Sequence, residues 1–171
     1  MTIRRDIPDG ARQDFEASSA SVAYLGFLTI THPNLVEPIR LVSDVFSYIH
    51  DGDTYVGLPF EWSLVRDTDG RPEARLTVAN TDRRIGQAVQ DSDERARLSL
   101  KLLASSDFDL SVDPREEIGT AATVYAYAHF ELANVEADVL QVSGVVTVFD
   151  PSTEPWPSIR ATQDRCPGLF R

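Results

Sequence analysis

The clearest hydrophobic pattern of the chain lies in residues 121–149. From Val124 to Leu132, apolar positions alternate with Tyr125, Tyr127, His129 and Glu131, the two-residue period of a strand whose faces differ. After the polar stretch 133–138, the segment 139–149 is again rich in Val and Thr, which favour strands. The pattern predicts a long antiparallel hairpin, and its outer edges would be unpaired in a monomer.

Shorter patterns predict further strands along the chain. A buried strand at 22–31 and a shorter one at 37–44 form one predicted hairpin. Asp51-Gly52-Asp53 is a turn signal between two more strands. Residues 60–65 and 74–78 predict a second hairpin, and the alternation over 95–104 predicts a half-solvated strand.

Helical and irregular segments complete the prediction. A helix of one or two turns is expected at 11–17 with Asp9 as its N-cap, and a short amphipathic helix at 80–93. Residues 105–120 have the composition of an acidic loop. We expect a mainly β fold, an antiparallel β-sandwich or partly closed barrel with one or two short helices. One domain covers 1–150, and a Pro-rich extended arm follows at 151–171.

Charge and composition exclude several classes of protein. The chain has 27 acidic and 16 basic side chains, a net charge of −11, which argues against a surface that grips nucleic acid. No apolar run approaches the ~20 residues of a membrane-spanning helix. The single cysteine, Cys166, cannot form an internal disulfide. No secretory signal is recognisable, so we expect the chain to fold in the cytoplasm.

No catalytic signature accompanies these elements. His32, His50 and His129 are scattered and favour structural roles. Residues 51–54 resemble a calcium loop only at their start, because carboxylates at the later ligand positions are missing. The glycines are too dispersed for a phosphate-binding loop. The sequence therefore predicts no catalytic residue, no cofactor and no metal, and it predicts that the protein is not an enzyme.

A few aromatic side chains are candidates for contacts with a partner. Tyr125, Tyr127 and His129 share one face of the predicted hairpin, where they would form a ligand platform or cover a second sheet or a neighbouring subunit. In the arm, Trp156 and Phe170 are candidate anchors. These five residues are the predicted subunit or partner contacts.

Taken in order, the segments resemble a family of tailed-phage proteins, the domain of unknown function DUF1833. The resemblance lies in the opening RQDFEASSASVAYLGFLTITHP, the strand PIRLVSD, the segment LPFEWSLVRD, the late hairpin FELANVEADVLQVSGVVTVFD and the end CPGLFR. Together they span nearly the whole chain.

This resemblance implies a structural component of a siphophage tail tip. Proteins similar to distal tail or minor tail proteins have a tail-tube-like β fold and form rings, here expected to hold six copies, between the tail tube and the baseplate hub. The implied partners are other copies of the chain, the tail tube protein and hub proteins, with DNA only in transit and no membrane contact. The implied location is the virion, after synthesis in the host cytoplasm. An acidic lumen would repel passing phosphates.

Two other classes of protein stay open. A carbohydrate-binding β-sandwich module of a phage tail would use an aromatic face such as Tyr125 and Tyr127, or Trp62. A small hydrolase would draw an acid pair from the carboxylate-rich loops, and Asp113 with Glu116 is the pair to test.

Overall fold

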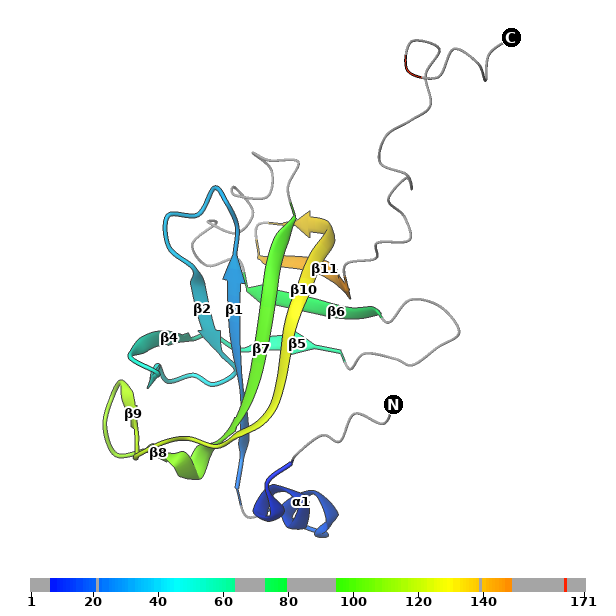
Figure 1. Cartoon of the computed structure of the whole chain (residues 1–171). Coiled ribbons are helices and arrows are strands. Elements are labelled where there is room, and N and C mark those ends of the chain that lie inside the picture. Colours follow the sequence, from blue (N-terminus) through cyan, green and yellow to red (C-terminus); the bar gives the residue numbers. More distant parts are fainter. Residues whose placement is uncertain are drawn as a thin grey trace.

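A computed structural model describes residues 7–20, 22–63, 73–79, 95–138, 140–148 and 165. One helix precedes the strands, and a 3-10 turn, η1 (Ser105–Asp107), follows β7 (Figure 1). The elements are α1 (Asp9–Glu16), β1 (Tyr24–Thr31), β2 (Ile39–Val42), β3 (Tyr48–His50), β4 (Asp53–Gly57), β5 (Phe60–Trp62), β6 (Glu73–Ala79), β7 (Ala96–Ala104), β8 (Phe108–Asp109), β9 (Arg115–Glu117), β10 (Thr123–Ala137) and β11 (Gln141–Val148). The predicted mainly β fold is confirmed.

All eleven strands belong to one sheet in the order β5-β6-β11-β10-β7-β1-β2-β4-β3-β9-β8. Two neighbouring pairs, β2 with β4 and β3 with β9, are parallel, and the remaining pairs are antiparallel. Within the described residues the sheet is not closed, and β5 and β8 are its two edge strands. The architecture agrees with a sandwich or a partly open barrel.

The predicted hairpins are present. β1 pairs with β2, and β5 pairs with β6, both antiparallel. β3 and β4 are joined by Asp51 and Gly52, whose φ angles of 54° and 80° suit the mirror-image turns that match strand twist. The acidic segment 105–120, expected to be a loop, contains β8 and β9 instead. Its strands are two and three residues long, too short for alternation to reveal them.

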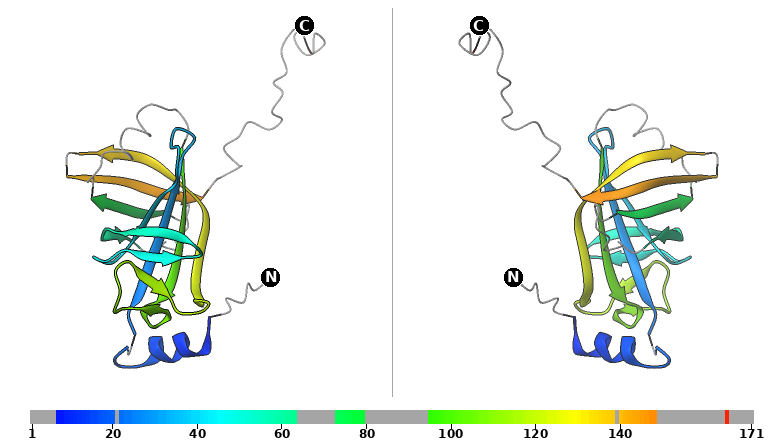
Figure 2. Two further views of the ribbon diagram at one scale, coloured as in Figure 1. Left: turned by 90° about the vertical axis from the view of Figure 1, so that its left-hand side faces the viewer. Right: turned by 90° about the vertical axis from the view of Figure 1, so that its right-hand side faces the viewer.

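The long hairpin of β10 and β11 is confirmed, but its edges are not free as predicted. β7 pairs with β10 as far as Leu132, and β6 pairs with β11 from Gln141 to Thr147. A register shift between Ala133 and Glu136 accompanies the φ of 49° at Asn134. Figure 2 shows that β10 runs first in the layer of β1 and β7 and then bends into the layer of β11 and β6. One strand thus belongs to two layers, because a bulge bends it.

The predicted faces of β10 are wrong over part of its length. Register shifts against β7 lie between Thr123 and Tyr125 and between Tyr127 and Phe130. Each shift adds a residue to β10, which exchanges its inward and outward faces. Ala126 is therefore exposed although simple alternation groups it with the buried Val124.

Two hydrophobic cores lie on opposite faces of β1. Leu28 and Ile30 belong to the first, which fills the space between the two layers. Leu25 and Phe27 belong to the second, which the strands β3, β4 and β8 cover. The second core consists of Leu25, Phe27, Val42, Tyr48, Tyr55, Leu103, Phe108 and Ala121. Burial on both faces accounts for the continuous apolar run of β1.

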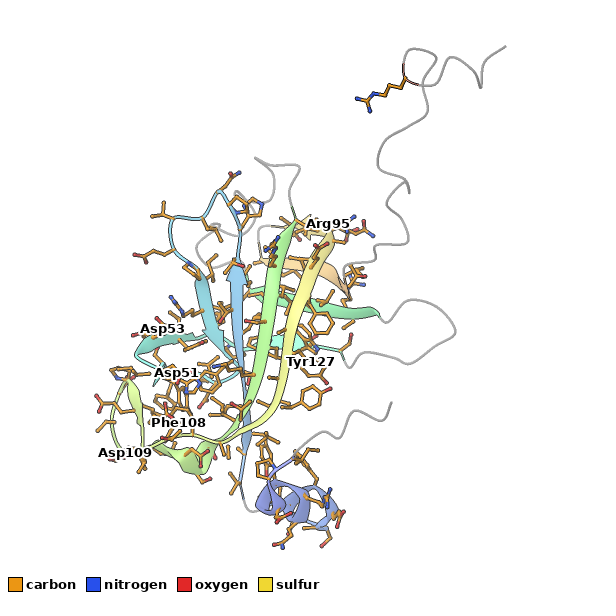
Figure 3. All side chains as sticks on the ribbon, viewed as in Figure 1. Asp51, Asp53, Arg95, Phe108, Asp109 and Tyr127 are labelled. Atoms are coloured by element: carbon orange, nitrogen blue, oxygen red, sulfur yellow. The ribbon has the colours of Figure 1, made fainter. Side chains whose placement is uncertain are left out.

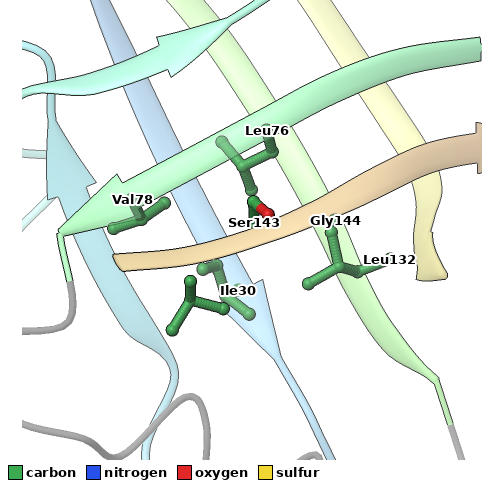
Figure 4. A pocket seen from close by; sticks show the side chains of 7 residues that line it. Ile30, Leu76, Val78, Leu132, Ser143 and Gly144 are labelled. Carbon is green, nitrogen blue, oxygen red and sulfur yellow. The ribbon is translucent and has the colours of Figure 1, made fainter. Parts of the chain in front are cut away.

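A small void remains in the first core beside Gly144 (Figure 4). Its volume is about 10 Å³, and its lining includes Ile30, Leu76 and Leu132. A Cβ at Gly144 would lie 2.8 Å from the Leu132 Cδ1 atom, so glycine lets the two strands approach. This void is barely the size of one water molecule and cannot hold a ligand.

The predicted first helix is present, but its cap differs. Pro8 occupies the N-cap position without a side-chain hydrogen bond, and Asp9 lies in the first turn. Proline suits this boundary because its φ is preset and it lacks an N–H group. The predicted helix at 80–93 and the arm at 151–171 lie outside the described residues, apart from Arg165. Nowhere in the described part is there a helix long and apolar enough to span a membrane.

Candidate functional site

The two predicted tyrosines lie together at the corner between the layers. Tyr125 and Tyr127 are half-buried, and their ring centroids are 4.1 Å apart. Tyr127 also lies 5.7 Å from Phe130 and 6.3 Å from Trp62 of β5. The side chain of Tyr127 projects beside β10 toward β5 in Figure 3. Tyr127 packs against the first core, and both tyrosines keep part of their surface exposed.

The other predicted contact residues are not brought to this corner by the described part. His129 belongs to β10, but its side chain lies outside the described residues. Trp156 and Phe170 also lie outside them. Of the five predicted contacts, the structure therefore joins only Tyr125 and Tyr127.

A polar cluster that the sequence did not indicate lies at the turn between β3 and β4. The His50 side chain is 4% exposed, and its Nδ1 lies 3.0 Å from the Glu117 Oε2 atom. On the other side of the ring, His50 Nε2 lies 3.2 Å from Asp51 Oδ2 and 3.4 Å from Lys101 Nζ. Lys101 Nζ donates to Asp51 Oδ2 at 3.0 Å. Glu117 reaches the cluster only because β9 pairs with β3.

Hydrogen bonds keep both carboxylates of the cluster ionised. The backbone N–H of Ala121 donates to Glu117 and lowers the pKa of that carboxyl, and His50 lowers it further against the opposing effect of burial. Lys101 donates to Asp51 and lowers the pKa of that carboxyl, with an electrostatic contribution from the neighbouring His50. The cluster is a network of charges that satisfy one another.

The same cluster contains three side chains that could ligate a metal. One ligand atom from each of His50, Asp51 and Glu117 lies within 4.8 Å of the other two. However, the ammonium group of Lys101 already lies against Asp51 and His50 Nε2. Lys101 thus already places a positive charge beside two of the three potential ligand side chains.

The Glu117→Gln variant should lose less stability in acid than the wild type does. The pKa of Glu117 lies below its ordinary value of 4.5 in the folded protein. The unfolded chain therefore takes up the proton first as the pH falls. The stabilisation is complete above about pH 4.5 and is lost as the pH falls through the lower folded pKa. Urea unfolding at pH 7 and pH 3.5 measures this difference.

In this experiment, Glu37→Gln provides the matched control, since Glu37 is an exposed glutamate in the loop before β2. Its acid dependence should equal that of the wild type. Equal acid dependence in the Glu117→Gln variant would contradict the contribution assigned to the Glu117 carboxylate.

A second network joins the loop after β2 to β9. Arg115 Nη1 donates to Asp44 Oδ2 at 3.0 Å and to the Tyr48 hydroxyl at 2.5 Å. Its guanidinium lies over the Phe46 ring, 4.1 Å from the centroid. Hydrogen bonds from Tyr48 and from the Val45 backbone lower the pKa of Asp44, although burial acts in the opposite direction. The network holds β9 beside β3.

Some of the exposed apolar side chains lie near the two ends of the sheet, while others lie in α1, in the loops on either side of β2, and on β4. At the β5 end, an open groove of about 320 Å³ lies between β5, β6 and the hairpin tip, and Leu140 in its lining is 78% exposed. Near β8, Leu110 is 50% exposed and Ile118 is 63% exposed. Exposed apolar side chains close to an open sheet edge are typical of surfaces that contact another chain.

Fold and surface together define a mainly β protein with an open sheet, charge networks that stabilise it, and apolar side chains near its free edges. The chain matches the family described as Domain of unknown function (DUF1833) over residues 10–161. It belongs to that family, as the sequence resemblance led us to expect. No curated protein matches the chain.

Proposed function

We propose that the protein is a structural component of a siphophage tail tip. It acts as a distal tail or minor tail protein that forms a ring around the DNA channel, between the tail tube and the baseplate hub. The observation that carries the proposal is the open sheet, whose edge strands β5 and β8 have no strand partner among the described residues. Head-to-tail contacts between different surfaces close into rings when the rotation permits.

The net charge supports the same proposal. With −11 charges, the protein surface repels the DNA backbone. A channel protein needs this property because DNA must pass without adhering. The carboxylates of Glu117 and Asp44 are paired with His50 and Arg115 within the fold, although the buried Nε of Arg115 has no hydrogen-bond partner among the described residues. This pairing supports a structural role for both networks.

Rings of about six copies are the expected result when the purified chain is examined across a range of concentrations. Light scattering after size-exclusion chromatography gives the mass, and negative-stain electron microscopy gives the shape. The central hole should be at least ~20 Å wide, since duplex DNA must pass. A monomer that binds glycans would instead favour the carbohydrate-binding module.

The aromatic pair Tyr125 and Tyr127 distinguishes the ring component from the carbohydrate-binding module. In a carbohydrate-binding module, Tyr125→Ala would abolish glycan binding, because sugar rings stack on exposed aromatic faces. If the protein is the proposed ring component, the wild-type chain should already show no binding on a glycan array.

A further inference from the structure

One surface of the molecule combines an open strand edge, exposed apolar side chains and unpaired negative charge. β8 is the last strand of the sheet, and β9 lies between it and β3. We call this surface the β8 edge and define it by Asp109, Leu110, Val112, Asp113, Glu116 and Ile118. Figure 3 places Asp109 at the outer margin of the molecule, with Phe108 beside it.

Two carboxylates of the β8 edge face each other. Asp109 and Glu116 are directly opposite in the antiparallel pair of β8 and β9. Like charges in this position destabilise a sheet. Among the described residues, the hydrogen bonds that Asp109 accepts come from Ser111, at 2.9 Å from its backbone N and 2.6 Å from its Oγ. Within the described part, none of the edge carboxylates has a cation partner, since the nearby Arg115 binds Asp44.

The apolar side chains of the same surface are also uncovered. Leu110, Val112 and Ile118 are 50%, 42% and 63% exposed. A partner for the β8 edge therefore needs positive charges, apolar side chains and an extended backbone that can pair with an edge strand.

The C-terminal segment of the chain has this composition. Residues 165–171 read RCPGLFR, with arginines at both ends and Leu169 and Phe170 between them. Only Asp164 is acidic between Arg160 and Arg171, whereas the whole chain carries −11 charges. The segment is complementary in charge and in apolar character to the β8 edge.

The length of the chain allows this segment to reach another copy. Residues 149–164 separate β11 from Arg165, and a proline-rich chain covers ~3.1 Å per residue, or ~50 Å in total. A domain of this size has a radius of gyration of only ~15 Å. The segment can therefore leave its own domain.

We infer that residues 165–171 of one copy dock on the β8 edge of a second copy. This inference rests on the proposed ring and names the contact that joins neighbouring subunits. Arg165 and Arg171 neutralise the facing carboxylates, and Leu169 and Phe170 cover the exposed Leu110 and Ile118. Each subunit then has one donor segment and one acceptor edge, as a closed ring requires.

The single cysteine of the chain provides a direct test. Cys166 lies within the docking segment, and Ser111→Cys places a second thiol on the β8 edge of the full-length protein. Under mild oxidation, docking between copies should give a ladder of disulfide-linked oligomers on a non-reducing gel. The control is Val36→Cys, because Val36 is fully exposed in the loop after β1. Cross-linking at position 111 should exceed the control about tenfold or more, since docking raises the effective concentration of the thiols.

Charge reversals in the Ser111→Cys background test the electrostatic contact. Glu116→Arg or Arg171→Glu alone should reduce cross-linking, and the two together should restore it. If a single charge reversal reduced cross-linking merely by unfolding the protein, the second reversal would not restore cross-linking.

Each outcome separates the docking contact from the ring itself. Wild-type rings with cross-linking no higher than the control would overturn the docking contact and leave the proposed function in place. A fast-migrating, internally linked monomer would show that the segment folds back on its own β8 edge, and would overturn docking between copies. A monomeric wild type without cross-linking would contradict both proposals.

Discussion

Replacing Phe27 with alanine should destabilise the protein by about 3–5 kcal/mol. Phe27 is 1% exposed at the centre of the second core. Its ring centroid lies 5.0 Å from that of Tyr55, 5.4 Å from Phe108 and 5.7 Å from Tyr48. Rigid rings from different strands cannot collapse into the space that a benzyl group leaves, so most of the cavity would persist.

The loss would extend to the charge network, because the His50 ring lies 5.5 Å from Phe27. Urea unfolding followed by far-UV circular dichroism measures the free energy. Phe15→Ala is the matched control: Phe15 is 55% exposed in α1 and touches Tyr24 at a centroid distance of 4.7 Å. The control should cost below about 1 kcal/mol. A similarly small loss for Phe27→Ala would contradict a second core centred on this ring.

Gly57→Ala should cost about 2–3 kcal/mol although it adds a single methyl group. A Cβ on Gly57 would collide with the backbone carbonyl of Val45 and would lie 2.5 Å from that of Phe46. These atoms belong to the loop between β2 and β3, which cannot yield like a side chain. The loop would have to move, and with it Asp44, the partner of Arg115.

Gly10→Ala tests whether the effect is specific to this position. In α1, nothing lies within 4 Å of the Cβ that this substitution would add. Alanine favours a helix by up to about 1 kcal/mol over glycine, so this control should be neutral or stabilising. Equal thermal stability of the two variants would contradict the close approach of the loop to Gly57.

The sequence predicted those parts of the fold whose signals are local. The alternation over 95–104 and the Asp51-Gly52 turn each depend on a few neighbouring residues, and β7 and the β3–β4 hairpin confirm them. The predicted inward and outward faces of β10 were wrong because of its bulges, since one added residue moves every following side chain to the opposite face of the sheet. Nothing in the sequence around Tyr127 marks the register shift that follows it.

The polar cluster around His50 could not be predicted from the sequence for a different reason. Glu117 is 67 positions from His50 along the chain, and they meet through the parallel pairing of β3 with β9. Lys101 comes from a third strand, β7. Such pairing is a property of the topology, and no local pattern encodes it.

The position of Lys101 makes one atom of this protein accessible to selective chemistry. Lys101 is the only lysine of the chain, its side chain is 39% exposed, and its Nζ lies 3.4 Å from the His50 Nε2 atom. Reductive methylation with ¹³C-formaldehyde keeps the positive charge and labels that nitrogen together with the amino terminus. The folded protein would then carry a single side-chain methyl resonance as a built-in reporter on the buried histidine.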